Sequence, residues 1–149
     1  MSFQLNFDSL VNYDAGQPGI TLDVSLRLVR DTVGCEAKVD TGSTFSIFGR
    51  KVGEDLGLTI EDGLKRTVST VTGNFVVYLH EVTLIVAGFE LDALVGFAAD
   101  ESFRRHVLGR RGFLDQSVVG LVDYEGRLYL SRYIPEMSGA RPIRSQSQD

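Results

Sequence analysis

A carboxylate, three hydroxyls and a glycine directly follow an apolar segment about one quarter of the way along the chain. Residues 39–44 read Val-Asp-Thr-Gly-Ser-Thr. A carboxylate can take a proton from water, and a glycine lets solvent and backbone approach it closely. The same residue types also favour ordinary polar turns, because Asp and Ser side chains bond to local backbone groups. The sequence therefore offers two interpretations of Asp40, a catalytic group or a turn residue.

The elements on either side decide how Asp40 is presented. From Ile20 to Leu28 apolar and polar residues alternate strictly, which is typical of a half-buried strand. The alternation resumes from Val33 to Val39, so the two segments are expected to form a hairpin. Asp40 then comes directly off the end of the second strand.

The rest of the chain indicates an all-β fold with one or two short helices. Short helices are expected at residues 49–58 and 109–115, where apolar residues have helical spacing. Turn signals separate a series of further apolar segments. The strands expected from them are 67–71, 75–79, 82–86, 89–95, 118–122 and 127–133.

Two short segments recur along the chain in the same order and at nearly the same offset. Val24–Leu28 resembles Val82–Val86, and the segment 46–51 resembles 106–111. This pattern predicts two related halves. The second half has no counterpart of Asp40-Thr41-Gly42, so each chain supplies a single carboxylate of this kind.

Residues 39–43, preceded by the alternating hairpin and followed far downstream by Val107-Leu108-Gly109-Arg110, resemble the retropepsin-like aspartic proteases. The resemblance spans about residues 19–130. It implies a closed or partly open β-barrel of the retropepsin type. A single motif in so short a chain differs from the two-lobed pepsin type, which carries two. The expected organisation is a lead segment at 1–18, the protease domain at 19–134 and a polar, disordered tail at 135–149.

The resemblance also implies a mechanism and a homodimer. Hydrolysis of a peptide bond without a metal or a covalent nucleophile needs one carboxylate to activate water and one carboxylic acid to protonate the carbonyl oxygen. A single Asp40 cannot fill both roles, so two copies are expected to bring their Asp40 side chains together. Thr41, Gly42 and Ser43 are expected to support the catalytic loop. Donation from Ser43 to the carboxylate would favour an acidic activity optimum.

Two further segments receive roles from the resemblance. Thr72, Gly73 and Asn74 lie where the family has the tip of its flap, a hairpin that closes over substrate; the plain alternative is an ordinary hairpin turn. Val107, Leu108 and Gly109 are expected to pack beneath the catalytic loop, and Arg110 to be structural. Viral members carry an acidic residue shortly after the catalytic motif, and it pairs with this arginine. Here Ser43 and Thr44 follow Gly42, so the sequence does not identify a partner for Arg110.

The composition of the chain limits which binding partners and which cellular compartment are expected. The net charge is −5 and the basic residues are scattered, so nucleic acid is not an expected partner. No segment has the apolar length of a membrane span. The single cysteine, Cys35, and the absence of a signal peptide favour a reducing, cytoplasmic location. The isolated His80 and His106 have no metal-site spacing, so neither a metal nor another cofactor is expected.

Two functions from different classes follow. The first is an aspartic endopeptidase acting on peptides or unstructured proteins. The second is a non-catalytic β module that uses the same fold for peptide binding or for dimerisation within a larger protein. The carboxylate favours the enzyme, because burying two like charges side by side carries a penalty that catalysis can justify.

Overall fold

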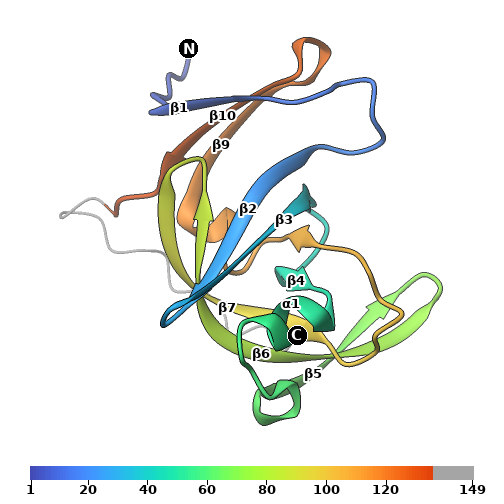
Figure 1. The fold of residues 1–149 in the computed structure, drawn as a ribbon. Coiled ribbons are helices and arrows are strands. Elements are labelled where there is room, and N and C mark those ends of the chain that lie inside the picture. The colour runs from blue at the N-terminus through green and yellow to red at the C-terminus, as the bar shows by residue number, and fades with distance from the viewer. Residues whose placement is uncertain (136–149) are drawn as a thin grey trace.

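The computed structural model describes residues 1–135; the expected tail lies outside the described residues from position 136 onward. Strands dominate, as Figure 1 shows, and the all-β prediction is confirmed. The strands are β1 (Ser9–Asn12), β2 (Thr21–Leu28), β3 (Asp31–Val39), β4 (Ile47–Phe48), β5 (Leu64–Thr70), β6 (Gly73–Val86), β7 (Phe89–Ala98), β8 (Val107–Leu108), β9 (Ser117–Val122) and β10 (Arg127–Arg132). The helical elements are α1 (Arg50–Asp55) and the single 3₁₀ turns η1 (Ile60–Asp62), η2 (Leu114–Gln116) and η3 (Asp123–Glu125).

The hairpin that presents Asp40 forms as its alternation predicts. Strands β2 and β3 pair antiparallel from Thr21 opposite Lys38 to Leu28 opposite Asp31. Leu22, Val24 and Leu26 are buried, while Asp23 between them is exposed. Because one face of the hairpin is buried in the core, a slip of one residue would expose its apolar side chains, and the end of β3 is fixed in register.

The larger sheet curls into a ring. Its order is β2-β3-β8-β4-β7-β6-β5, and an additional antiparallel pairing of β2 with β6 closes six of these strands on themselves. Strand β5 remains outside the ring, attached to β6, and the β5–β6 hairpin extends from the body of the molecule in Figure 1. A separate three-stranded sheet has the order β1-β10-β9.

The predicted internal repeat has a structural counterpart. The two matching strands β2 and β6 pair with each other antiparallel, Val24 lying opposite Val86. The two matching short strands β4 and β8 also pair antiparallel, at Ile47 and Val107. Each short strand lies parallel to the long strand of the other half, β8 beside β3 and β4 beside β7. The halves are therefore interlocked, and this interlocking holds β8 against the strand that ends at Asp40.

Three elements differ from expectation. The strands predicted at 75–79 and 82–86 are one continuous strand, β6, because it pairs with β5 over one part of its length and with β7 over another. The helix predicted at 109–115 is wrong; only the 3₁₀ turn η2 forms, beginning at Leu114. Strand β1 was missed inside the lead segment and pairs antiparallel with β10.

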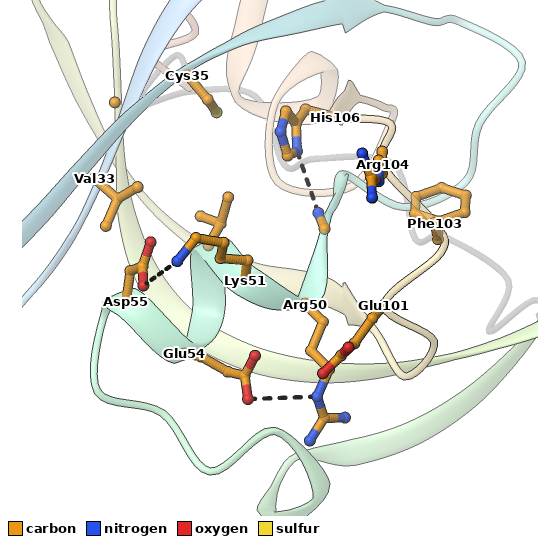
Figure 2. Close-up of a pocket in the computed structure, with 13 residues that line it drawn as sticks. Val33, Cys35, Arg50, Lys51, Glu54, Asp55, Glu101, Phe103, Arg104 and His106 are labelled. Atoms are coloured by element: carbon orange, nitrogen blue, oxygen red, sulfur yellow. Dashed lines mark hydrogen bonds and ion pairs between the residues drawn. The ribbon is translucent and has the colours of Figure 1, made fainter.

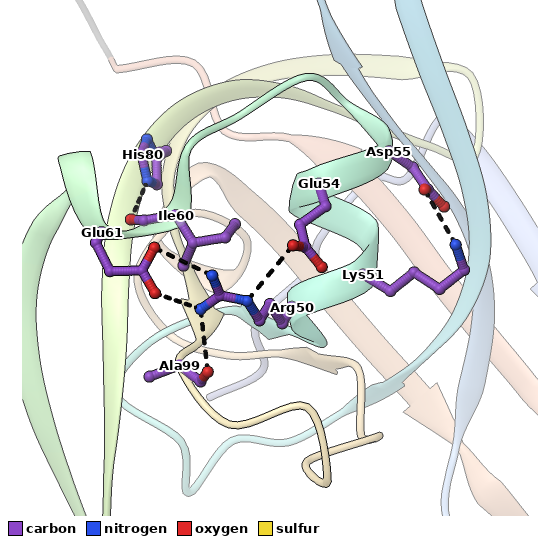
Figure 3. A network of polar contacts seen from close by, with 8 residues as sticks. All are labelled: Arg50, Lys51, Glu54, Asp55, Ile60, Glu61, His80 and Ala99. Atoms are coloured by element: carbon purple, nitrogen blue, oxygen red, sulfur yellow. Dashed lines mark hydrogen bonds and ion pairs between the residues drawn. The ribbon is translucent and has the colours of Figure 1, made fainter.

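Helix α1 is fastened to its surroundings by Arg50, as Figure 3 shows. The guanidinium contacts Glu61 of η1 with both of its terminal nitrogens, at 2.5 and 3.1 Å, and donates to the carbonyl of Ala99 at 3.1 Å. Glu54 lies 3.6 Å away on the next turn. The hydrogen bonds from Arg50 lower the pKa of Glu61. A six-residue helix is too short to be stable alone, so these contacts and its buried Val52 hold it.

The core lies inside the ring of strands. Its largest fully buried side chains include Phe48, Phe97 and Phe113. A second, smaller cluster of buried residues lies under the β5–β6 hairpin and contains Phe45, Ile47, Val77 and Leu79. Among the described residues, no helix has the length and apolar character needed to cross a membrane.

Candidate active site

Asp40 is exposed at the end of β3, and its loop is held by backbone hydrogen bonds. The Asp40 N–H donates to the carbonyl of Leu108 at 2.9 Å, which ties the residue to β8. The Gly42 N–H donates to Asp40 Oδ1 at 2.9 Å, and the Ser43 N–H donates to the Asp40 carbonyl at 3.2 Å. One carboxylate oxygen is thus oriented by the turn, so the turn chemistry of this motif serves to position the carboxylate.

Ser43 does not contact the carboxylate. Its hydroxyl donates to the carbonyl of Phe45 at 2.7 Å, so the expected hydrogen bond from Ser43 to Asp40 is absent from this structure. The backbone N–H of Gly42 takes that place because the chain turns back on the carboxylate within two residues. Thr41, between them, is exposed.

The downstream segment lies directly against the Asp40 loop. The N–H groups of Arg110 and Arg111 donate to the carbonyls of Ser43 and Thr44, each at 2.8 Å. A methyl group at Gly109 would lie 2.2 Å from the carbonyl oxygen of Phe45, so only glycine allows this approach. The segment containing Val107, Leu108 and Gly109 therefore packs against the loop.

Ser46 connects the two segments and was missed by the sequence analysis. It is fully buried; its hydroxyl donates to the carbonyl of Arg111 at 2.9 Å and accepts from the Gly109 N–H at 3.0 Å. A serine inside the apolar segment 45–48 was the available signal, because a buried hydroxyl needs partners. The Arg111 guanidinium lies over the Phe45 ring, 5.7 Å from its centroid.

The Arg110 side chain takes no part in these contacts. Its side chain is exposed, and no described residue forms a hydrogen bond or ion pair with it. The acidic partner that this arginine has in viral members therefore has no counterpart among residues 1–135. Its backbone, by contrast, is held at both ends, since the Asp115 N–H donates to the Arg110 carbonyl at 2.8 Å.

A groove of about 410 Å³ separates Asp40 from the β5–β6 hairpin. The hairpin contributes residues 67–70 and Phe75, and Val107 lines the opposite side with Ile47. Val107 therefore faces the groove as well as packing against the loop. The predicted flap residues Thr72, Gly73 and Asn74 do not line it. The hairpin loop consists of Val71 and Thr72, because Thr70 pairs with Gly73, and the lining comes from the arms instead.

The hairpin is joined to the opposite wall of the groove by an aromatic pair. Phe75 of β6 stacks on Phe103 of the segment between β7 and β8, with ring centroids 4.8 Å apart and an interplanar angle of 23°. Both rings belong to the cluster under the hairpin and line the groove. We therefore expect this contact to help hold the hairpin over Asp40.

A larger cavity of about 700 Å³ lies elsewhere, between α1, β3 and the segment 101–106, and Figure 2 shows its lining. None of the predicted site residues lines it. Cys35 is half-buried there, and burial raises its pKa to about 11, so the thiol is protonated at neutral pH. His106 accepts from the Gly49 N–H at 3.2 Å and stacks on Phe48, as expected of a histidine with satisfied partners.

Comparison with known proteins identifies the family. Residues 26–120 match the family model described as aspartyl protease. The chain belongs to the aspartyl protease family. The match includes Asp40 with its loop, both arms of the hairpin and the segment from Val107 to Arg110.

Solved structures place this aspartyl protease among the retropepsin folds. A retropepsin-like aspartic protease from Rickettsia conorii superposes with a TM-score of 0.59 at 14% identity, covering 83% of this chain and 97% of that one. EIAV protease, solved in complex with the inhibitor HBY-793, gives a TM-score of 0.51 at 20% identity, covering 67% and 88%. A comparison with curated protein sequences gave no significant match. The retropepsin-like fold expected from the sequence is confirmed.

Proposed function

We propose that this protein is an aspartic endopeptidase in which two copies of Asp40, one from each chain of a homodimer, activate the attacking water. The observation that carries the proposal is the position of Asp40. It is exposed at the end of β3, oriented by the Gly42 N–H, and is the one carboxylate among the described residues that line the groove beneath the hairpin.

The chemistry requires the second copy. One carboxylate accepts a proton from water while the other, protonated, donates to the carbonyl oxygen of the scissile bond. Two carboxylates that are brought next to each other share a proton and titrate as a pair. In a two-fold dimer each chain offers the same surface to the other, so Asp40 meets Asp40 when the axis passes between them. The exposed Thr41 beside it is free to donate across that axis.

The groove accommodates an extended peptide. Strand β5 is the last strand of its sheet and pairs only with β6 among the described strands, so the groove runs beside a strand with a free edge. Extended peptides bind such edges through backbone hydrogen bonds, while pockets for side chains give selectivity. Residues 67–70 lie on β5 and line the groove. A strand of substrate between β5 and the Asp40 loop would place its peptide bonds near the carboxylates.

Replacing Asp40 with Asn tests the proposal. Cleavage of an unstructured protein should fall by a factor of about 10² to 10⁴ or more, since the variant loses both the base and the acid. The exposed Asp62, on η1, supplies the control: Asp62→Asn should leave the rate unchanged. A wild-type protein that is inert over the acidic range and insensitive to a statine-type inhibitor would instead favour the non-catalytic peptide-binding module.

A further inference from the structure

One cation lines the groove in front of Asp40. Among the described residues that form its walls, Asp40 and Arg105 are the charged ones; the others are apolar, hydroxylic or glycine. Arg105 lies on the segment between β7 and β8, two residues before Val107. The groove therefore contains a positive group that the proposed hydrolysis does not use.

Arg105 has no partner within the described chain. Its side chain is exposed, and no residue of 1–135 forms an ion pair or a side-chain hydrogen bond with it. Arg27, Arg50 and Arg127, by contrast, each lie within ion-pair distance of a glutamate. A guanidinium that faces a groove with its donors unused is available to bind a carboxylate, which it can contact with two parallel hydrogen bonds.

The neighbouring arginine faces the other way. Arg104 lines the larger cavity beside α1, where Figure 2 shows it with His106 and Phe103, whereas Arg105 lines the groove. The two arginines therefore offer a matched pair, with the same charge and nearly the same place in the chain but different cavities.

We propose that Arg105 selects substrates with an aspartate or glutamate side chain close to the scissile bond. This selectivity rests on the proposed endopeptidase function. The aromatic and aliphatic walls of the groove, among them Phe45, Phe75 and Phe103, exclude part of the water that would otherwise screen the ion pair. In a two-fold dimer a second Arg105 occupies the equivalent place on the other side of the paired Asp40 residues. Acidic side chains are therefore selected on both sides of the cleaved bond.

Cleavage-site mapping tests the proposal. The wild-type protein is incubated with a pool of peptides from a digested proteome, at about pH 5.5, where a glutamate side chain with a pKa of about 4.3 is ionised. We expect Asp and Glu to be enriched near the cleaved bonds. A peptide from this set is then made with Glu or with Gln at the enriched position. Its kcat/KM should be about three- to tenfold higher with Glu, and high salt should reduce the difference.

Variants assign the preference to Arg105. Arg105→Gln should abolish the Glu-over-Gln preference while cleavage of the Gln peptide persists, and Arg105→Lys should retain most of it. Arg104→Gln should retain it in full. An unchanged preference in Arg105→Gln would overturn the proposal. So would an equal loss of rate on both peptides, because that result means that Arg105 acts on the Asp40 pair or on the fold rather than on the substrate side chain.

A binding measurement separates this proposal from the proposed function. Asp40→Asn protein is applied to an array of paired extended peptides that differ only in Glu or Gln, and the same array is probed with the double variant that also carries Arg105→Gln. Preferential retention of the Glu peptides, lost in the double variant, supports the proposal even if the wild-type protein cleaves nothing. Equal retention of both peptides by the Asp40→Asn protein contradicts it.

Discussion

At the scale of single residues, the site depends on a few buried polar contacts behind an exposed carboxylate. Asp40 is oriented by the Gly42 N–H, but the loop that carries both residues is held from behind by Ser46 and by the backbone of residues 109–111. A catalytic group must be held within a fraction of an ångström of its working position. We therefore expect the site to depend on the residues that fix the Asp40 loop as well as on the carboxylate itself.

Replacing Ser46 with Ala should lower the free energy of unfolding by about 1–3 kcal/mol, because the Gly109 N–H is left buried without its acceptor. Urea denaturation measures the change. Thr83→Ala serves as the control: it removes an exposed hydrogen bond to Asp92 and should cost no more than about 0.5 kcal/mol. Equal stability of the Ser46→Ala variant and the wild type would show that Ser46 does not hold the two segments together.

At the scale of elements, the β5–β6 hairpin is the part of the site whose position is least constrained by the ring of strands. Its distal part, from residue 64 to Phe75, pairs only within the hairpin, since the pairing of β6 with β7 begins at Val77. The stack of Phe75 on Phe103 supplies its contact with the opposite wall. Such a hairpin is suited to open and close over a peptide.

Phe75→Ala should therefore loosen the hairpin. Amide hydrogen exchange over residues 64–76 should become faster, and KM should rise more than kcat falls, because an aromatic pair contributes about 0.5–1.5 kcal/mol beyond its buried area. Phe7→Ala provides the matched control, since it removes another aromatic contact, with Tyr129, in the separate three-stranded sheet. Unchanged exchange in the Phe75→Ala hairpin would mean that the stack does not hold it.

His106 joins β8 to the start of α1 and should make stability depend on pH. Burial lowers the pKa of His106 in the folded protein, so the unfolded chain binds this proton more readily. Stability should therefore decrease as the pH falls through about 6.5, the ordinary value, until the lower folded pKa is passed. In His106→Asn, which keeps an acceptor for the Gly49 N–H, this decrease should be smaller. Urea denaturation between about pH 7.5 and pH 5 measures how the free energy of unfolding changes with pH in the wild type and in His106→Asn. The same change in both proteins would show that His106 does not cause it.

The sequence predicted the elements in which apolar and polar residues alternate over many positions. The alternation in β2 and β3 placed Asp40 at the end of a half-buried strand, and the repeat of short segments predicted two related halves, although not that the halves interlock. Strand β1 was missed because four residues give too little alternation, and because its partner β10 lies at the other end of the described chain. The contacts of Ser43 and Ser46 depend on which carbonyls the folded loops bring near, which no local pattern contains.

At the scale of the whole molecule, each chain provides half of the proposed site. One Asp40 lies in each groove, and the second half of the internal repeat offers no other carboxylate to pair with it. In the proposed mechanism, a single chain has a base but no acid to complement it. We therefore expect the homodimer to cleave peptides and the single chain to be inactive.

Mixing wild-type and Asp40→Asn chains tests this claim most directly. The two proteins are unfolded together, refolded in known proportions at constant total concentration, and assayed for cleavage. If both carboxylates are needed, activity follows the square of the wild-type fraction, so an equal mixture retains about one quarter of the full activity. Activity in linear proportion to the wild-type fraction would show that one chain is sufficient, and would contradict hydrolysis between two Asp40 residues.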